Sequence, residues 1–387
     1  MNNRRLLAEW LSVIARSWFA ISDRNAGAFF LDLSHDIFLL HWRIRLMCRS
    51  RYQRLVCGSF AALLLLVALP QAQAGITFQA NYLDGANEGF NDTSVYGGST
   101  LGAVRRNAFE FAMNIWGSAL APSYAGETIT IDASFDGLGG TSTSATLAQA
   151  GTNRHWDLND TNPLLYADAL ANHNVGYDIL VGTSEGNAIF NSDVDGSTVL
   201  GTKTWYYGTD NNAGANQIDF VSTALHEIGH TIGFQGLIAQ DGSYTGSITG
   251  GDFSEYFSQY DYFVVRTSDQ SILRNLSQTD RATAITNNDI SWGGAQAIAA
   301  NGGTLPKLYA PSTWASGSSY SHLDETTFAL ELMSPLYTDG TTHEISALTM
   351  GMMVDMGWTS AVPEPGTLAV WSVLAITTSL VRRRRRD

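Results

Sequence analysis

Apolar and polar residues alternate along the chain in patterns that predict both strands and helices. Alternation with a period of two over residues 76–83 and 128–135 predicts two half-buried strands. Apolar residues at helical spacing predict a helix over 104–120. The short apolar run at 177–181 predicts a buried strand. The first half of the chain therefore combines helix and sheet.

A second helix is predicted over residues 217–234. Asp219 is a candidate N-cap, and Gly233 is suited to end the helix because glycine accepts the left-handed conformation that a C-cap needs. The apolar residues recur on one face of this helix, at Phe220, Ala224, Ile228 and Ile232.

The rest of the central region predicts a more irregular second half. Stretches rich in glycine and serine at 137–144 and 242–251 predict loops. The methionine-rich run 348–356 has helical spacing and predicts a core helix. For the aromatic residues 205–207 we favour a strand packed on the core over an exposed platform for sugar or peptide. Without a repeat or long linker, residues 75–361 predict one α+β domain.

The N-terminal residues 1–74 resemble a leader. Arginines precede an apolar run at 61–69, and Ala72-Gln73-Ala74 is typical of a signal-peptide cleavage site. Because this leader is unusually long, we interpret residues 1–46 as an over-extended gene start, with Met47 as the true start; a genuine extra segment is the alternative. The pattern predicts export.

The C-terminal residues 362–387 form a tail of three parts. Val362-Pro363-Glu364-Pro365 precedes an apolar stretch at 366–381 and then five arginines at 382–386. This tail resembles a PEP-CTERM sorting signal, which implies transient membrane anchoring, removal by an exosortase-type enzyme, and delivery to the envelope or extracellular matrix of a Gram-negative bacterium. A plain membrane anchor, the alternative, predicts the same initial topology.

The charge of residues 75–361 narrows the choice of partners. This region holds 8 Lys plus Arg and 30 Asp plus Glu, a formal charge of −22. Such acidity argues against nucleic acid or anionic membrane surfaces as partners. It is compatible with bound Ca²⁺, for which Asn191, Asp193 and Asp195 are candidate ligands, but we favour a solvated turn there because the full calcium-loop pattern is absent.

The helix at 217–234 carries a motif for metal chemistry. His226 and His230 lie four residues apart and therefore on one helical face, where both can bind one zinc ion. Glu227 is next to the first ligand, where it can take a proton from a metal-activated water as general base. The spacing H-E-x-x-H is the signature of a zinc metallopeptidase.

A catalytic zinc site usually has a third protein ligand. In the compact metzincin motif that ligand would fall at Gly236, which has no side chain to donate. We favour His322, with Glu255 as the rival third ligand. His343 is interpreted as a residue near the ligands or on the surface, and the two remaining histidines of the domain are interpreted as loop residues: His155 and His173.

The neighbourhood of His322 carries a resemblance to a family. His322 stands a short distance before Glu331-Leu332-Met333-Ser334-Pro335, which predicts a methionine-containing turn. This arrangement resembles the leishmanolysin-like metzincins, in which a third histidine follows a long insertion and precedes a methionine turn beneath the zinc. The resemblance covers about residues 75–358 and implies roles for six residues, namely His226, His230 and His322 as ligands, Glu227 as base, Gly233 as bend and Met333 as turn residue.

The resemblance implies a metzincin-like zincin fold, with mixed sheet and zinc helix in an N-terminal lobe and a Met-turn in a more irregular C-terminal lobe. The expected function is a secreted zinc-dependent endopeptidase acting on protein or peptide substrates; Tyr309 and Tyr320 are candidate oxyanion donors. Family members are typically rich in disulfides, whereas both cysteines here, Cys48 and Cys57, lie in the leader. The alternative is a non-catalytic envelope or extracellular-matrix protein that retains the fold.

Overall fold

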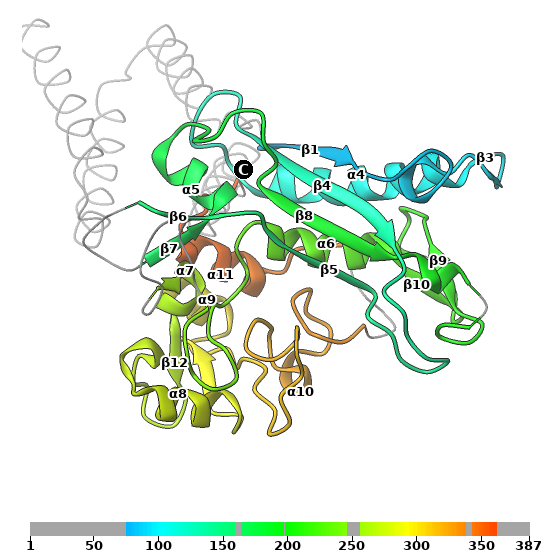
Figure 1. The fold of residues 1–387 in the computed structure, drawn as a ribbon. Helices are drawn as coiled ribbons and strands as arrows, with labels where there is room; N and C mark the ends of the chain where they lie inside the picture. Colours follow the sequence, from blue (N-terminus) through cyan, green and yellow to red (C-terminus); the bar gives the residue numbers. More distant parts are fainter. Residues whose placement is uncertain (1–74, 159–163, 197, 246–255, 338–342, 362–387) are drawn as a thin grey trace, which may run out of the picture. The chain divides into compact units, whose positions relative to one another are not determined.

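The computed structural model describes residues 75–158, 164–196, 198–245, 256–337 and 343–361 (Figure 1). These residues form a mixed α+β structure with one four-stranded sheet, several smaller sheets and eight α-helices. The predicted α+β class is therefore confirmed. The predicted leader at 1–74, the predicted sorting tail at 362–387, Glu255 and most of the loop predicted at 242–251 lie outside the described residues.

The four-stranded sheet is the centre of the first half. Its strand order is β1 (Thr77–Tyr82), β4 (Thr128–Asp136), β8 (Gly186–Asn191) and β5 (Ala148–Thr152). The first three strands are parallel and β5 is antiparallel to β8. Along β4, alternate side chains are buried, as expected for a strand that packs one face on the core. The predicted strands at 76–83 and 128–135 are confirmed, whereas β8 and β5 were not predicted.

Two helices cover one face of this sheet (Figure 1). They are α4 (Leu101–Ala119) and α6 (Phe220–Thr231), and the indole Nε1 of Trp116 on α4 donates to the carbonyl oxygen of Leu225 on α6 at 2.9 Å. An aromatic cluster fills the space between sheet and helices, with Phe190 of β8 and Phe220 of α6 in contact at 4.6 Å between ring centroids. The core thus fixes α6 against the sheet.

The smaller elements of the first half surround this core. The hairpin β2 and β3 precedes α4, and β10 pairs in parallel with β9 immediately before α6. The bounds are β2 (Val95–Tyr96), β3 (Ser99–Thr100), β6 (His155–Asp157), β7 (Leu164–Ala167), α5 (Asp168–Val175), β9 (Thr204–Tyr206) and β10 (Gln217–Asp219).

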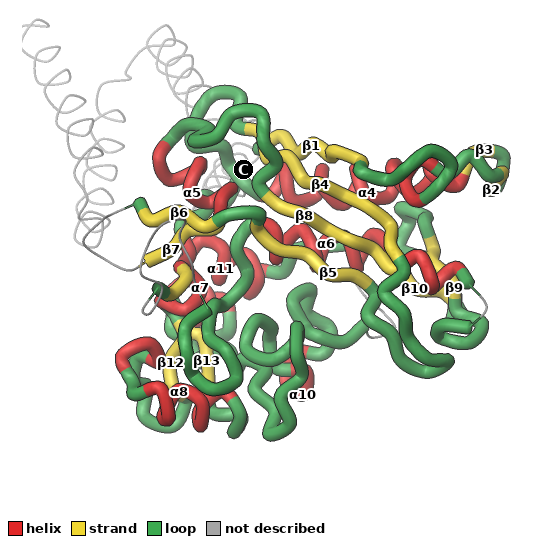
Figure 2. Tube along the Cα trace, in the orientation of Figure 1, coloured by secondary structure: helices red, strands yellow, loops and turns green. Residues whose placement is uncertain are grey.

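The second half is less regular, and in Figure 2 the short helix α10 lies among loops. Its bounds are β11 (Phe257–Ser258), α7 (Gln259–Tyr262), β12 (Val264–Arg266), α8 (Gln278–Ile285), β13 (Ile290–Trp292), α9 (Ala295–Ala300), α10 (Glu325–Phe328) and α11 (Ala347–Met356).

The methionine-rich helix predicted at 348–356 is confirmed as α11. Gly351 lets it approach α9 closely, because a Cβ at that position would lie 2.9 Å from the Cα of Ala297. After the helix, the indole of Trp358 donates to the carbonyl oxygen of Ile232, which follows α6. The C-terminal part of the domain is therefore tied to the helix that carries the two motif histidines.

Two predictions about local structure are wrong. Residues 177–181 are turns after α5, which ends at Gly176 with φ +79°, and Val181 is 83% exposed. Residues 217–219, predicted as helix, form β10, and α6 starts at Phe220 because the side chain of Asp219 caps it. The predicted strand at 205–207 is confirmed by β9, with Trp205 and Tyr207 buried.

In the part of the chain that the structure describes, no helix combines the length and apolarity needed to cross a membrane.

Candidate metal centre

Helix α6 brings His226 and His230 to the same face, one turn apart. The carboxylate of Asp219 accepts a hydrogen bond from the backbone N–H of Ser222 at 2.7 Å, which satisfies one of the free donors at the start of the helix. The helix ends at Thr231, and Gly233 has φ +110°, a left-handed conformation that turns the chain away directly after the second histidine.

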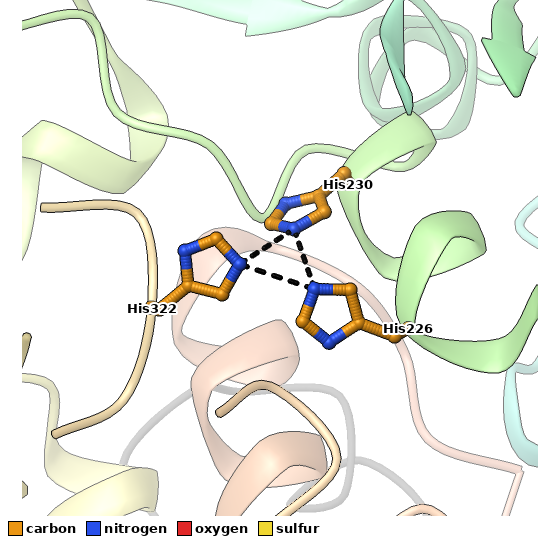
Figure 3. A group of neighbouring side chains, drawn as sticks. All are labelled: His226, His230 and His322. Carbon is orange, nitrogen blue, oxygen red and sulfur yellow. Dashed lines mark hydrogen bonds between the residues drawn. The ribbon is translucent and has the colours of Figure 1, made fainter. Parts of the chain in front are cut away.

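His322 joins these two residues from a loop far along the chain (Figure 3). The three side chains form the single group of metal-binding geometry found among the described residues. Their Nε2 atoms lie 3.1 Å apart in each of the three pairs. The structure thus brings together the three residues expected to bind the metal.

The other ring nitrogen of each histidine contacts a backbone carbonyl oxygen. Nδ1 lies 2.7 Å from the oxygen of Leu332 in His226, 2.7 Å from that of Phe234 in His230, and 2.8 Å from that of Ser318 in His322. A carbonyl oxygen only accepts, so Nδ1 carries the proton in all three rings. In neutral histidines this tautomer leaves a lone pair on each Nε2.

Three lone pairs therefore converge on one point. Two neutral Nε2 acceptors cannot form a hydrogen bond with each other, so the short contacts drawn in Figure 3 are of the kind that a shared cation would bridge. A tetrahedral zinc ion with nitrogens at about 2.0–2.1 Å would hold those nitrogens about 3.3 Å apart, close to the observed 3.1 Å. The three imidazoles fit zinc in both chemistry and spacing.

Burial keeps these histidines neutral. It lowers the pKa of His230 to about 3, with a smaller contribution from His226, and it lowers the pKa of His226 although the bond to Leu332 opposes the shift. The pKa of His322 is also well below its usual value, first because of burial and then because of the other two rings. At neutral pH all three side chains are therefore in the form that binds metal.

Glu227 follows His226 in α6 and is 6% exposed. Burial raises the pKa of its carboxyl group to about 8. Among the described residues no hydrogen bond to this carboxyl group is found, and its oxygens are not among the fully buried polar atoms that lack a partner, so solvent can reach them. A carboxyl group next to a metal ligand in the sequence, with a pKa near neutrality, is suited to proton transfer.

The segment around Met333 contacts the chain at two of the three candidate ligands. Met333 is fully buried, and its backbone oxygen accepts from the N–H of Leu323, next to the third ligand, at 2.9 Å. The preceding residue, Leu332, holds His226 through its carbonyl oxygen. The methionine segment therefore contacts both a helix ligand and the chain beside His322.

The two tyrosines considered as oxyanion donors differ in what the structure shows. The hydroxyl of Tyr320 donates to the carboxylate of Asp261 at 2.6 Å and is buried, so the expectation that it serves as an oxyanion donor is wrong. The backbone N–H of Tyr309 donates to the carbonyl oxygen of His322, and the carbonyl oxygen of Tyr309 accepts from the N–H of Tyr320.

The remaining described histidines lie outside the triad. His343 Nε2 is 2.9 Å from the Asp219 carboxylate, so this residue contacts the cap of α6. His173 Nδ1 is 2.8 Å from the carboxylate of Glu127 in the core. Burial lowers the pKa of His155 to about 4. The interpretation of His155 and His173 as loop residues is wrong, because they belong to β6 and α5.

The candidate calcium loop is built from protein contacts. Asn191 accepts from the N–H of Asp193, and Asp193 accepts from the N–H of Gly139 at 2.9 Å. Asp195 pairs with the guanidinium of Arg105 at 2.8 Å. These oxygens hold a short helical turn together, so the turn that we favoured from the sequence is confirmed, but it is not solvated throughout because Asn191 is fully buried.

Sequence reasoning missed the groups that orient the histidines. The three acceptors are backbone oxygens of Leu332, Phe234 and Ser318, so no residue type marks them in the sequence.

Comparison with protein-family models gave no match for this chain, and no curated protein matches it.

Proposed function

We propose that this chain is a zinc-dependent endopeptidase of the metzincin type. The observation that carries the proposal is the convergence of three Nε2 lone pairs, from His226, His230 and His322, together with a carboxyl group of raised pKa, Glu227, next to His226 in the sequence of α6. Zinc, when bound, supplies Lewis-acid polarisation of a carbonyl group and makes water more acidic. A binding protein without catalysis has no need for a costly buried carboxyl group at this position.

Each residue has a defined task. The three histidines would hold the ion through Nε2, and their Nδ1–H groups fix the orientation of the rings. Glu227 accepts a proton from the attacking water and returns it to the leaving amine, and a pKa near neutrality suits both directions of transfer. Met333 packs beneath α6 as the turn residue of the metzincin arrangement.

The sheet offers a place for an extended peptide. β5 is the last strand of the four-stranded sheet and packs on α6 (Figure 1). Among the described residues no strand pairs with its outer edge, so backbone N–H and C=O groups are free to bind a peptide as an added strand. An edge strand beside the metal helix favours a peptide or protein substrate.

Export and anchoring form the second part of the proposal. The signal peptide in residues 1–74 would direct the domain across the membrane, and the tail at 362–387 would anchor it until an exosortase-type enzyme removes the tail. The acidic domain would then act in the envelope or the extracellular matrix.

The test is casein hydrolysis by the full chain with and without a zinc chelator. We expect hydrolysis that stops with chelator and returns when zinc is added. No hydrolysis of casein or of a mixed peptide library, by protein shown to contain zinc, would contradict the endopeptidase proposal and favour a non-catalytic matrix protein.

A further inference from the structure

His322 reaches the metal centre on a segment with an unusual backbone. Tyr320, two residues before the ligand, has φ +78° and is 1% exposed. A tyrosine in the left-handed region is strained because its Cβ approaches the backbone, so neighbouring contacts must hold it there. Those contacts decide where the third ligand lies.

Both ends of Tyr320 are held in the core. Its hydroxyl donates to Asp261 Oδ1 at 2.6 Å, and its backbone oxygen accepts from the hydroxyl of Tyr260 at 2.9 Å. Asp261 is fully buried. A hydrogen bond to a buried carboxylate is stronger than one between neutral groups, so the Tyr320 ring has one defined position.

The same carboxylate holds the chain that follows α6. Both oxygens of Asp261 lie 3.1 Å from the N–H of Leu237, and Oδ2 accepts from the N–H of Ser258 at 2.6 Å. Leu237 belongs to the bend after His230. One buried acceptor therefore joins the segment after the two helix ligands to the segment that carries the third.

Gly236 makes this junction possible. A Cβ at position 236 would lie 2.0 Å from Cε1 of Tyr320, so a side chain there would displace the ring. The N–H of Gly236 also donates to the hydroxyl of Ser321 at 3.1 Å, directly before His322. At the position where the compact motif has its third histidine, this chain has a glycine that receives the segment bearing His322.

We propose that Asp261 and Tyr320 are positioning residues that set the place of His322 and thereby the affinity and geometry of the metal centre. This inference rests on the metal-binding part of the proposed function and not on peptidase activity. Tyr320→Phe removes only the hydroxyl and keeps the ring over Gly236, so the fold is preserved while the ring loses its anchor. Asp261→Asn replaces one of the two acceptor oxygens by an NH₂ group. This new donor would face the three groups that donate to the carboxylate: Leu237 N–H, Ser258 N–H and the Tyr320 hydroxyl.

The matched control is Tyr207→Phe. Tyr207 is also a buried tyrosine whose hydroxyl donates to a carboxylate, that of Asp195 at 2.7 Å, and its hydroxyl also accepts from Arg105. Its ring packs on Phe220, the first residue of α6, but the hydroxyl that the variant removes bonds with neither ligand segment. Tyr207→Phe therefore shows how much the loss of one buried hydroxyl lowers the general stability. We expect it to leave the metal centre unchanged.

The experiment measures zinc affinity of the full chain by competition with a chromophoric chelator, together with the visible spectrum of the cobalt-substituted protein. We expect Tyr320→Phe to weaken zinc binding 10–100-fold and to change the cobalt spectrum, and Tyr207→Phe to leave both as in the wild type. Wild-type affinity and spectrum in Tyr320→Phe, or equal losses in both variants, would overturn the inference. In a further outcome, the wild type binds zinc without hydrolysing casein while Tyr320→Phe binds zinc more weakly and Tyr207→Phe binds it as the wild type does. That outcome would support this inference and contradict the proposed peptidase activity.

Discussion

The sulfur of Met333 lies against the backbone of Gly229, so close that a Cβ at position 229 would be 2.8 Å from it. Gly229 stands between the two histidines of α6, one residue before His230. The methionine therefore supports the helix at the turn that carries the metal ligands. Glycine fits there despite its low helix propensity, because a Cβ would meet the sulfur unless the methionine moved.

Gly229→Ala tests this contact. The added methyl group would also lie 3.1 Å from Cε of Met333, so the methionine or the helix must shift. We expect a loss of about 1–3 kcal/mol in the free energy of unfolding, as for other overpacked cores, and weaker zinc binding. Urea unfolding and chelator competition measure the two effects. The double variant Gly229→Ala with Met333→Ala, which makes room for the methyl group, should recover zinc affinity relative to Gly229→Ala; a further loss would count against this contact as the cause.

Glu227→Gln separates metal binding from turnover. The amide keeps the shape of the side chain but cannot accept the proton, so zinc content should stay at the wild-type level while casein hydrolysis falls by about 10²–10⁴-fold. The control Glu110→Gln changes an exposed glutamate on α4 and should keep full activity. Wild-type hydrolysis in Glu227→Gln would remove this residue as the base.

Replacing the third histidine should abolish tight metal binding. In His322→Asn only two imidazoles remain, and we expect zinc to be lost during dialysis. His343→Asn is the matched control, because His343 pairs with Asp219 and lies outside the triad. Zinc content after dialysis, measured by atomic emission, checks the prediction. Equal zinc retention in the two variants would show that His322 is not a ligand.

The stability of the metal-free protein should fall in mild acid. Burial lowers the pKa of His230 from 6.5 to about 3, so between these values the unfolded chain binds a proton and the folded chain does not. The free energy of unfolding therefore decreases as the pH falls below 6.5, by about 1.4 kcal/mol per pH unit for this residue. Urea unfolding in chelator at several pH values should give a shallower pH dependence for His230→Asn than for the wild type. Identical slopes would contradict a neutral, buried His230.

The local part of the site could be predicted because it depends on helix periodicity. His226 and His230 are four residues apart, and a cap at Asp219 and a bend at Gly233 set the limits of their helix. His322 was favoured only because Met333 follows it in a pattern resembling a known family. Spacing alone carries no information about a ligand so far along the chain.

Other features had no local signal. The run at 177–181 is apolar enough for a strand, but Gly176 ends α5 in a left-handed conformation and the chain continues as exposed turns; the strand that joins the sheet is β8, several residues later. The Ser258–Asp261 spacing fits the capping box of α7. Nothing in that spacing indicates that the same carboxylate also receives Leu237 and Tyr320.

The most direct test of the central claim is zinc X-ray absorption fine structure on the full chain loaded with one equivalent of zinc. We expect a single zinc environment with three imidazole nitrogens at about 2.0–2.1 Å, which falls to two in His322→Asn. A zinc environment with fewer than three imidazoles in the wild type, or one unchanged in His322→Asn, would contradict this claim.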